Sequence, residues 1–190
     1  MIRRHCPIPA AAGLRCLPIL LALLFLHAFE PRAEGAQEYQ VKAAMVVNLS
    51  KYIEWPAEAF PRTGAPLQIC SVGRGPFSAA LEQYQGKTVL GHPLSLRRLA
   101  TGDEPSECNV LVVSGIEKRY LAGVLDLARR RGVLTVGDIP DFARFGGVIG
   151  LVENDGRVRF EINLKAAQQS RVKISSQLLK LAKLIREGDQ

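Results

Sequence analysis

Along the middle of the chain, short apolar runs alternate with segments whose apolar residues recur every three or four positions. The runs predict strands at 67–72, 94–99, 109–114 and 133–138, and the segments between them predict helices at 76–85 and 117–131. Three of the strands are apolar on both faces, which is typical of a parallel sheet covered by helices on two sides. The pattern therefore predicts an α/β fold, a three-layer sandwich with a mainly parallel sheet flanked by helices.

The pattern changes on either side of this region. Residues 147–164 predict two strands around Asn154-Asp155-Gly156, so an antiparallel hairpin is expected near the C-terminus. A helix is expected over residues 38–55, and Trp55-Pro56 ends it because the residue before proline avoids the helical conformation. The predicted buried stripe of this helix consists of Val41, Ala44, Met45, Asn48, Leu49, Tyr52 and Ile53.

Two helices are expected at the C-terminus, one from about Lys165 and a longer one over residues 175–186. Leu179 and Leu184 fall outside the apolar stripe of the longer helix, and lysines such as Lys180 supply its polar remainder. The stripe assigned to the core consists of Ile174, Leu178, Leu181 and Ile185. The spare apolar surface predicts further core packing or a surface for self-association or a partner. A helix lying on a membrane is a third interpretation, although no aromatic residue anchors its apolar face.

The N-terminal segment has the pattern of a secretory signal. Arginines precede an apolar run at 16–29, which is shorter than the roughly 20 residues of a membrane span. Small residues at Ala33 and Gly35 suit cleavage before residue 36. Residues 1–35 are therefore predicted to be a signal peptide for Sec-type export, and residues 36–190 a single exported α/β domain. An uncleaved membrane anchor is the alternative.

Two of the four cysteines, Cys70 and Cys108, remain after the predicted cleavage. In an exported chain a disulfide between them is expected, because the compartment is oxidising. Their positions raise a difficulty, since Cys70 falls late in one predicted strand and Cys108 just before another. A bridge tolerates a Cα separation of only about 4.4 to 6.8 Å. Either the strands are staggered or the thiols are free and buried.

The charge of the predicted mature domain is mild. Its 21 basic and 16 acidic residues give a net charge of +5, against +7 for the whole chain. The basic residues are dispersed and are not interleaved with aromatic ones, so no nucleic-acid partner is expected. Attraction to an anionic membrane surface or to an acidic protein patch stays open.

No recognisable catalytic motif is present, and neither a cofactor nor a metal is expected. The loop at 71–78 has Ser78 where a dinucleotide loop has its third glycine, and Arg97 and Arg98 stand where an acidic residue is needed. His92 is the only histidine of the predicted mature chain, and no nucleophile or metal-ligand pattern surrounds it. The sequence favours a protein that is not an enzyme.

Two segments make the chain recognisable: EYQVKAAMVVNLSKYIEWP at 38–56 and VRFEINLKAAQQSRVKISSQLLKLAKLI at 158–185. They resemble the opening and closing motifs of the YfiR family of periplasmic proteins. Relatives commonly carry more aromatic residues where this chain has MVVNLSKY. The most distinctive matching positions are Asn48, Trp55, Pro56, Phe160, Glu161, Asn163, Ser175 and Ser176.

The resemblance implies a periplasmic repressor that is not an enzyme. Such a protein binds an inner-membrane diguanylate cyclase, YfiN-like, and thereby lowers cyclic di-GMP and biofilm formation. An OmpA-like outer-membrane lipoprotein, YfiB-like, sequesters the repressor and releases the cyclase. Family membership also implies a homodimer.

The residues of the partner or dimer surface are a separate prediction. Trp55, Leu179 and Leu184 lie off the predicted buried stripes and are expected to contact a partner, and the same surface is expected to include Ile174, Leu178 and Lys180. A periplasmic small-molecule-binding protein is the alternative function, with a pocket at the strand ends near Gly73 and Gly115. A hydrolase is a third hypothesis.

Overall fold

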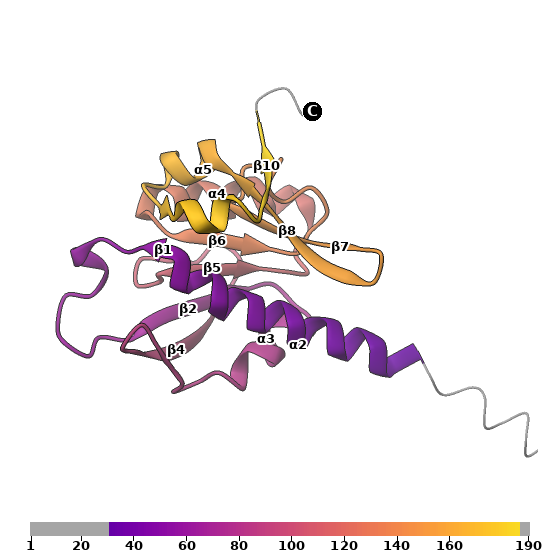
Figure 1. The fold of residues 1–190 in the computed structure, drawn as a ribbon, viewed down its shortest axis with the longest axis horizontal. Coiled ribbons are helices and arrows are strands. Elements are labelled where there is room, and N and C mark those ends of the chain that lie inside the picture. Colours follow the sequence, from indigo (N-terminus) through magenta and orange to yellow (C-terminus); the bar gives the residue numbers. More distant parts are fainter. Residues whose placement is uncertain (1–30, 187–190) are drawn as a thin grey trace, which may run out of the picture. The chain divides into compact units, whose positions relative to one another are not determined.

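The computed structural model describes the backbone of residues 31–186 and the side chains of residues 35–186 (Figure 1). The predicted signal segment therefore lies almost entirely outside the described residues. By its contacts the chain separates into residues 1–35 and residues 36–190, and the second unit contains the whole sheet. The cleavage site stays a prediction. None of the helices described here has the length and apolar character that crossing a membrane requires.

The main sheet has eight strands in the order β10-β8-β7-β6-β5-β2-β4-β3. Strands β7, β6, β5, β2 and β4 are mutually parallel, β8 is antiparallel to β7, β10 is parallel to β8, and β3 is antiparallel to β4. The strands are β2 (Leu67–Val72), β3 (Thr88–Val89), β4 (His92–Leu99), β5 (Val110–Val113), β6 (Leu134–Gly137), β7 (Ile149–Asn154), β8 (Arg157–Asn163) and β10 (Lys183–Ile185). The predicted mainly parallel α/β sheet is confirmed.

Helices cover both faces of this sheet, as the apolar runs predict. The helices are α2 (Pro31–Leu49), α3 (Pro76–Glu82), α4 (Lys118–Arg131), α5 (Leu164–Gln169) and α6 (Ser176–Leu179). Alternate residues of β5 enter two different cores, because successive side chains of a strand point to opposite faces. Val110 and Val112 join α2 and α3 in one core, whereas Leu111 and Val113 join α4 in the other. The three-layer arrangement is thereby confirmed (Figure 1).

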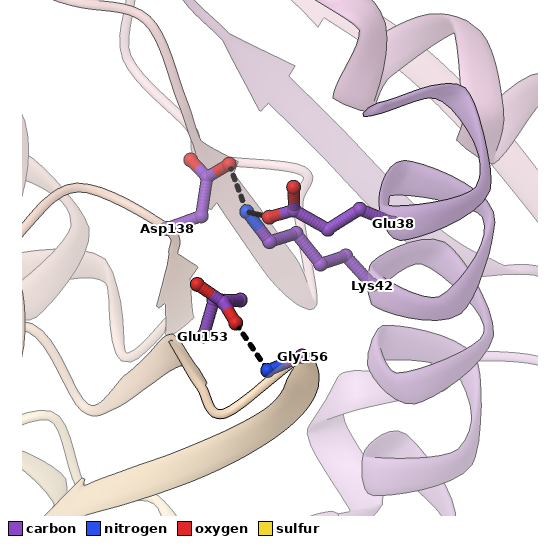
Figure 2. Close-up of polar contacts among 5 residues, drawn as sticks. All are labelled: Glu38, Lys42, Asp138, Glu153 and Gly156. Carbon is purple, nitrogen blue, oxygen red and sulfur yellow. Dashed lines mark hydrogen bonds and ion pairs between the residues drawn. The ribbon is translucent and has the colours of Figure 1, made fainter. Parts of the chain in front are cut away.

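The predicted hairpin is also confirmed. Strands β7 and β8 pair from Ile149 opposite Ile162 to Asn154 opposite Arg157. Asp155 and Gly156 form the turn with φ of 52° and 69°, the left-handed conformation that a tight hairpin turn requires. The Glu153 carboxylate accepts a hydrogen bond from the Gly156 N–H at 2.7 Å, which closes the turn (Figure 2).

The first helix differs from its prediction in length and in its buried face. Helix α2 ends at Leu49, and the chain continues through the 3₁₀ turn η1 (Ser50–Tyr52) into a short strand, β1 (Ile53–Glu54). The buried face runs through Ala43, Val46, Val47 and Ser50. Much of the predicted stripe faces outward instead: Val41 is 44% exposed, Tyr52 is 40% exposed, Ala44 and Met45 are half-buried, and Asn48 is exposed. Both faces have apolar residues at helical spacing, so the pattern alone cannot choose between them.

The predicted long C-terminal helix is wrong. Only α6 is helical, and Lys183–Ile185 instead forms β10, which pairs with β8 at the edge of the sheet. Leu178 and Ile185 are buried as predicted, but Leu181, which was assigned to the core, is 74% exposed. The physical reason is that the unpaired edge of β8 offers backbone hydrogen bonds, which compete with a local helix.

A buried ion pair joins α2 to the end of β6. The Lys42 ammonium lies 2.6 Å from the Glu38 carboxylate and 3.0 Å from that of Asp138, and the Lys42 and Asp138 side chains are each 7% exposed (Figure 2). The ammonium also lies 4.8 Å from the centre of the Tyr39 ring. Burial lowers the pKa of Lys42, but the hydrogen bonds and charges of Glu38 and Asp138 outweigh that effect, so the pKa is raised above 10.5.

We expect Lys42→Met to lower the free energy of unfolding by about 3 kcal/mol, because it leaves the Asp138 carboxylate buried without its cation. Urea denaturation of the purified domain measures this loss. Lys51→Met is the matched control: Lys51 is exposed and donates only to Asn48, so its loss is expected to cost under about 0.5 kcal/mol. Equal losses in the two variants would contradict the role assigned to Lys42.

The same pair predicts a pH dependence at the alkaline end. Because the folded pKa of Lys42 lies above its unfolded value of 10.5, the stability that the charged lysine contributes is fully present below pH 10.5. That stability is lost as the pH rises through the folded pKa. The stability difference between wild type and Lys42→Met should therefore be constant from pH 7 to 9 and shrink above pH 10.5. A difference that grows with pH would contradict the assignment.

Candidate functional site

The two segments that carry the family resemblance meet in space, although they lie at opposite ends of the domain. Strand β1 pairs with β9 (Lys173–Ile174) in a separate two-stranded antiparallel sheet, with Ile53 opposite Ile174 and Glu54 opposite Lys173. The Ser175 N–H extends the pairing by donating to the Tyr52 carbonyl at 2.9 Å. We call this pair of strands the β1–β9 ribbon. It joins the end of α2 directly to the start of α6.

Trp55 follows β1 and is fixed from two sides. Its indole Nε1–H donates to the Ser50 carbonyl at 3.1 Å, and its ring packs in a T-shaped arrangement with that of Phe60, with ring centres 6.4 Å apart. Phe60 in turn stacks on the His92 imidazole, with ring centres 3.6 Å apart, and His92 Nδ1 lies 2.7 Å from the Ala65 carbonyl. The half-buried Trp55 is therefore held rigidly. His92 begins β4 and serves as an aromatic support for Phe60.

A cleft of about 990 Å³ opens beside the ribbon, at the amino ends of β2 and β5. Trp55 and Pro56 form part of its wall. Four arginines also line it: Arg62, Arg130, Arg131 and Arg171. Arg130 pairs with Asp126 and Arg131 with Glu104, whereas Arg62 and Arg171 form no ion pair within the described part of the chain. The carboxylates of Glu54, Glu58 and Glu107 line it too, so the cleft combines an aromatic wall with side chains of both charges.

The Cys70–Cys108 disulfide lies at the same cleft. It joins β2 to the segment before β5 with a Cα separation of 5.8 Å, and Cys108 lines the cleft. Cys70 lies opposite Leu111 in the register of β2 with β5, and Cys108 precedes β5 as the sequence predicts. The difficulty is resolved because a turn, and not an extended strand, leads into β5 at Cys108. The Cys108 N–H donates to the Pro105 carbonyl at 3.1 Å, which bends the chain toward Cys70 before β5 begins.

The cleft does not lie near Gly73 and Gly115, where the sequence predicts a pocket. The loops after β2 and β5 touch there: a Cβ at Gly73 would lie 1.9 Å from the Ser114 carbonyl oxygen, and one at Gly115 would lie 1.7 Å from that of Arg74. Both glycines have positive φ, of 101° and 61°. The strand order reverses between β2 and β5, and in open α/β sheets ligands bind beyond the carboxyl ends of the strands at such a reversal. In this protein the backbone of the loops after β2 and β5 occupies the place where such a ligand would bind.

Most other motif residues support the backbone. Asn163 caps α5 by accepting from the Ala166 N–H at 2.9 Å and also donates to the Ala143 carbonyl at 2.7 Å. Ser175 caps α6 by accepting from the Leu178 N–H at 3.3 Å. Glu161 binds the Lys183 ammonium at 2.7 Å, which holds β10 on β8. Among the other motif residues, Phe160 is half-buried against the core and Ser176 is exposed. The Pro56 carbonyl accepts a hydrogen bond from the Ala59 N–H, and the Asn48 side chain accepts one from Lys51.

The structure separates the residues predicted for the partner surface. Trp55 and Ile174 lie together at the ribbon. Leu178 is buried in the core, Leu179 and Leu184 are half-buried against it, and Lys180 is exposed. No partner contact tests this surface, and it stays a prediction. The sequence missed the cleft arginines, because they come from three segments that only the fold brings together.

Among residues 35–186, no group of three or more His, Cys, Asp or Glu side chains is placed to hold a metal ion. Arg62 or Arg171 could bind an anion in the cleft, and Trp55 could contact an aromatic group there.

The model of the YfiR/HmsC-like family matches residues 39–183. The chain belongs to the YfiR/HmsC-like family. The match contains the ribbon, the cleft and nearly all of both recognisable segments. The YfiR-like family is a periplasmic, regulatory family. Membership in the YfiR-like family, expected from the two segments, is confirmed.

Solved structures share the fold. A conserved domain protein from Vibrio cholerae O1 biovar eltor is similar with a TM-score of 0.53 and 11% identity, covering 78% of this chain and 60% of that one. An ABC domain in complex with L-Trp from Streptococcus pneumoniae is similar with a TM-score of 0.52 and 14% identity, covering 75% of this chain and 60% of that one. The chain thus spans about 60% of the length of each of these structures.

We expect reduction of the Cys70–Cys108 disulfide to lower the free energy of unfolding by about 4 kcal/mol, as the chain-entropy model gives for this sequence separation of 38 residues. Thermal melts with and without reductant measure the change. A Cys70→Ala/Cys108→Ala double variant is the control, because its melting temperature should be low and should not respond to reductant. Equal melting temperatures of the wild type with and without reductant would contradict the expectation.

Proposed function

We propose that this protein is a periplasmic repressor that binds the periplasmic part of an inner-membrane diguanylate cyclase, YfiN-like, and holds it inactive. An outer-membrane OmpA-like lipoprotein, YfiB-like, competes for the repressor, so that cyclic di-GMP and biofilm formation rise when it binds. The match of the YfiR/HmsC-like family over residues 39–183 carries this proposal. The repressor acts by binding and catalyses no reaction, and it forms a homodimer.

The rim of the cleft beside Trp55 supports a role in binding a protein partner. Tryptophan and arginine are enriched among the residues that dominate the energy of protein interfaces, and they work best when they are held in place before binding. Trp55 is fixed by Ser50 and Phe60, and the unpaired Arg171 lies in the same cleft, directly before the ribbon. We assign this rim to the cyclase contact.

Repression on this scheme is an equilibrium. The repressor binds the inactive conformation of the cyclase more tightly than the active one, which shifts the population toward the inactive form. The lipoprotein lowers the concentration of free repressor through its own affinity, and the cyclase returns to activity by mass action.

The first experiment captures partners from detergent-solubilised envelopes with the tagged full chain. A diguanylate cyclase should be retained, and cyclase activity should fall as purified repressor is added. Failure to retain any diguanylate cyclase would overturn the proposed function.

The second experiment tests the assigned surface. Arg171→Glu should weaken binding to the cyclase by roughly tenfold and raise cyclic di-GMP in cells, because a charge at the contact is reversed. Arg119→Glu is the matched control, since Arg119 is 68% exposed at the start of α4 and pairs only with Glu117. Both variants should melt like the wild type. Equal affinities in the two variants would reject the rim as the contact while leaving repression itself in place.

The cleft also favours a second function, the binding of a small anionic or aromatic molecule. Its volume of about 990 Å³ lies at the upper end of the range of ligand pockets. Native mass spectrometry of the protein purified from periplasm would show a bound metabolite, which Arg62→Ala/Arg171→Ala should release. A spectrum of the bare chain alone would leave only the protein-binding function.

A further inference from the structure

One stretch of the outer edge of β8 has no strand beside it. Strand β10 pairs with β8 only at Glu161, Ile162 and Asn163. On its inner side β8 pairs with β7 as far as Arg157 opposite Asn154. Within the described part of the chain, no strand pairs with the outer side of residues 157–160. Strand β10 therefore covers only part of the outer edge of β8, and the described residues 157–160 form an unpaired edge of the sheet.

The backbone groups of this stretch point outward at alternate residues. The Asn163 N–H donates to the Val148 carbonyl at 2.9 Å, toward the β7 side. In an antiparallel pair, the residues that bond to the neighbour alternate with residues that face away from it. Val158 and Phe160 are out of phase with Asn163, so their N–H and C=O groups face the outer edge. The parallel pairing of Lys183 with Glu161 uses the Phe160 carbonyl, so the Val158 N–H and C=O and the Phe160 N–H are the groups placed to receive another strand.

A groove of about 610 Å³ lies along this edge. Met45 of α2 and the half-buried Val158 and Phe160 contribute its apolar side. Leu181, 74% exposed, lines the same groove, and its polar lining comes from Glu153, Asn154, Arg159, Glu161 and Lys183. The groove thus provides apolar contacts beside the outward-facing backbone.

The opposite face of the same stretch is cationic, and among residues 35–186 no carboxylate pairs with its two arginines. Arg157 and Arg159 are both exposed, and the residues directly opposite them on β7 are Asn154 and Val152. Glu161, the next residue on that face, is already bound to Lys183 at 2.7 Å. An added strand would place its own side chains directly beside these two arginines, because facing residues of paired strands lie about 5 Å apart.

We propose that residues 157–160 of β8 bind an extended segment of a partner protein in which acidic residues alternate with apolar ones. The acidic residues lie beside Arg157 and Arg159, the apolar ones enter the groove with Val158, Phe160 and Leu181, and the backbone continues the sheet beyond the short β10. Recognition by strand addition draws affinity from the backbone and specificity from alternate side chains. A second copy of the same edge fits poorly, because pairing would bring the arginines of both copies together.

This inference goes beyond the proposed repression and does not depend on it. The probe is a fluorescent peptide of eight residues in which valine and glutamate alternate, titrated into the full chain and followed by anisotropy. A peptide with lysine in place of glutamate should bind at least roughly tenfold more weakly, because like charges meet at the edge. A glutamate peptide N-methylated at every second amide should also bind more weakly, since it keeps its side chains but loses the backbone hydrogen bonds.

Variants of the protein locate the site. Arg157→Glu/Arg159→Glu should weaken binding of the glutamate peptide by roughly tenfold. Arg119→Glu/Arg129→Glu on α4 makes the same change of charge on exposed residues that line neither the cleft nor the groove, and it should leave the affinity unchanged. Hydrogen exchange of the Val158 and Phe160 amides should slow when the peptide binds.

Three outcomes would overturn the proposal. Equal affinity for the acidic and basic peptides would remove the charge recognition, and equal affinity for the N-methylated peptide would remove the strand addition. Unchanged exchange at Val158 and Phe160 would place any binding elsewhere. Capture of the diguanylate cyclase is a separate measurement, so failure of the strand-addition proposal leaves the repressor proposal intact, and the reverse also holds.

Discussion

The antiparallel pairing of β1 with β9 is the constraint on which the rest of the structure depends. It links residues that are separated by most of the domain, Ile53 with Ile174 and Glu54 with Lys173. This pairing fixes the end of α2, Trp55 and the start of α6 relative to one another. Strands β1 and β9 are, however, only two residues long. So short a sheet is not stable alone. Its persistence rests on buried neighbours such as Ile53 and Val172, which belong to the core shared with α2.

The two ends of the parallel strands differ in how closely the loops pack. At the carboxyl ends of β2 and β5 the loops pack backbone against backbone through Gly73 and Gly115, and no space is left for a ligand between them. At the amino ends, the ribbon, the disulfide and the cleft lie together. A fold that elsewhere holds ligands at strand carboxyl ends therefore presents its recessed surface at the opposite end. Under the proposed function, this recessed surface is the one that contacts the partner.

One face of α2 and one edge of β8 remain uncovered and are available for contacts with other molecules. Helix α2 carries apolar residues on two faces, and only the one through Ala43, Val46 and Val47 is buried. The other contributes Met45 to the groove along β8. Strand β10 covers three residues of β8 and leaves the neighbouring stretch with Arg157 and Arg159 bare. Charged residues at a free edge hinder indiscriminate pairing, and the same charges select an oppositely charged strand.

The sequence by itself determined the parallel sheet and its helices. The strand at Leu67–Val72 and helix α4 match their predicted bounds to within a residue, and Asp155-Gly156 forms the expected turn, because these elements follow from local periodicity and turn chemistry. Tertiary structure alone decided which face of α2 is buried and that residues 183–185 form a strand. Both faces of α2 satisfy the helical pattern, and a helix and an edge strand suit residues 183–185 about equally until β8 offers its hydrogen bonds. The cleft likewise depends on segments far apart in the chain, and no local pattern records how a sheet brings them together.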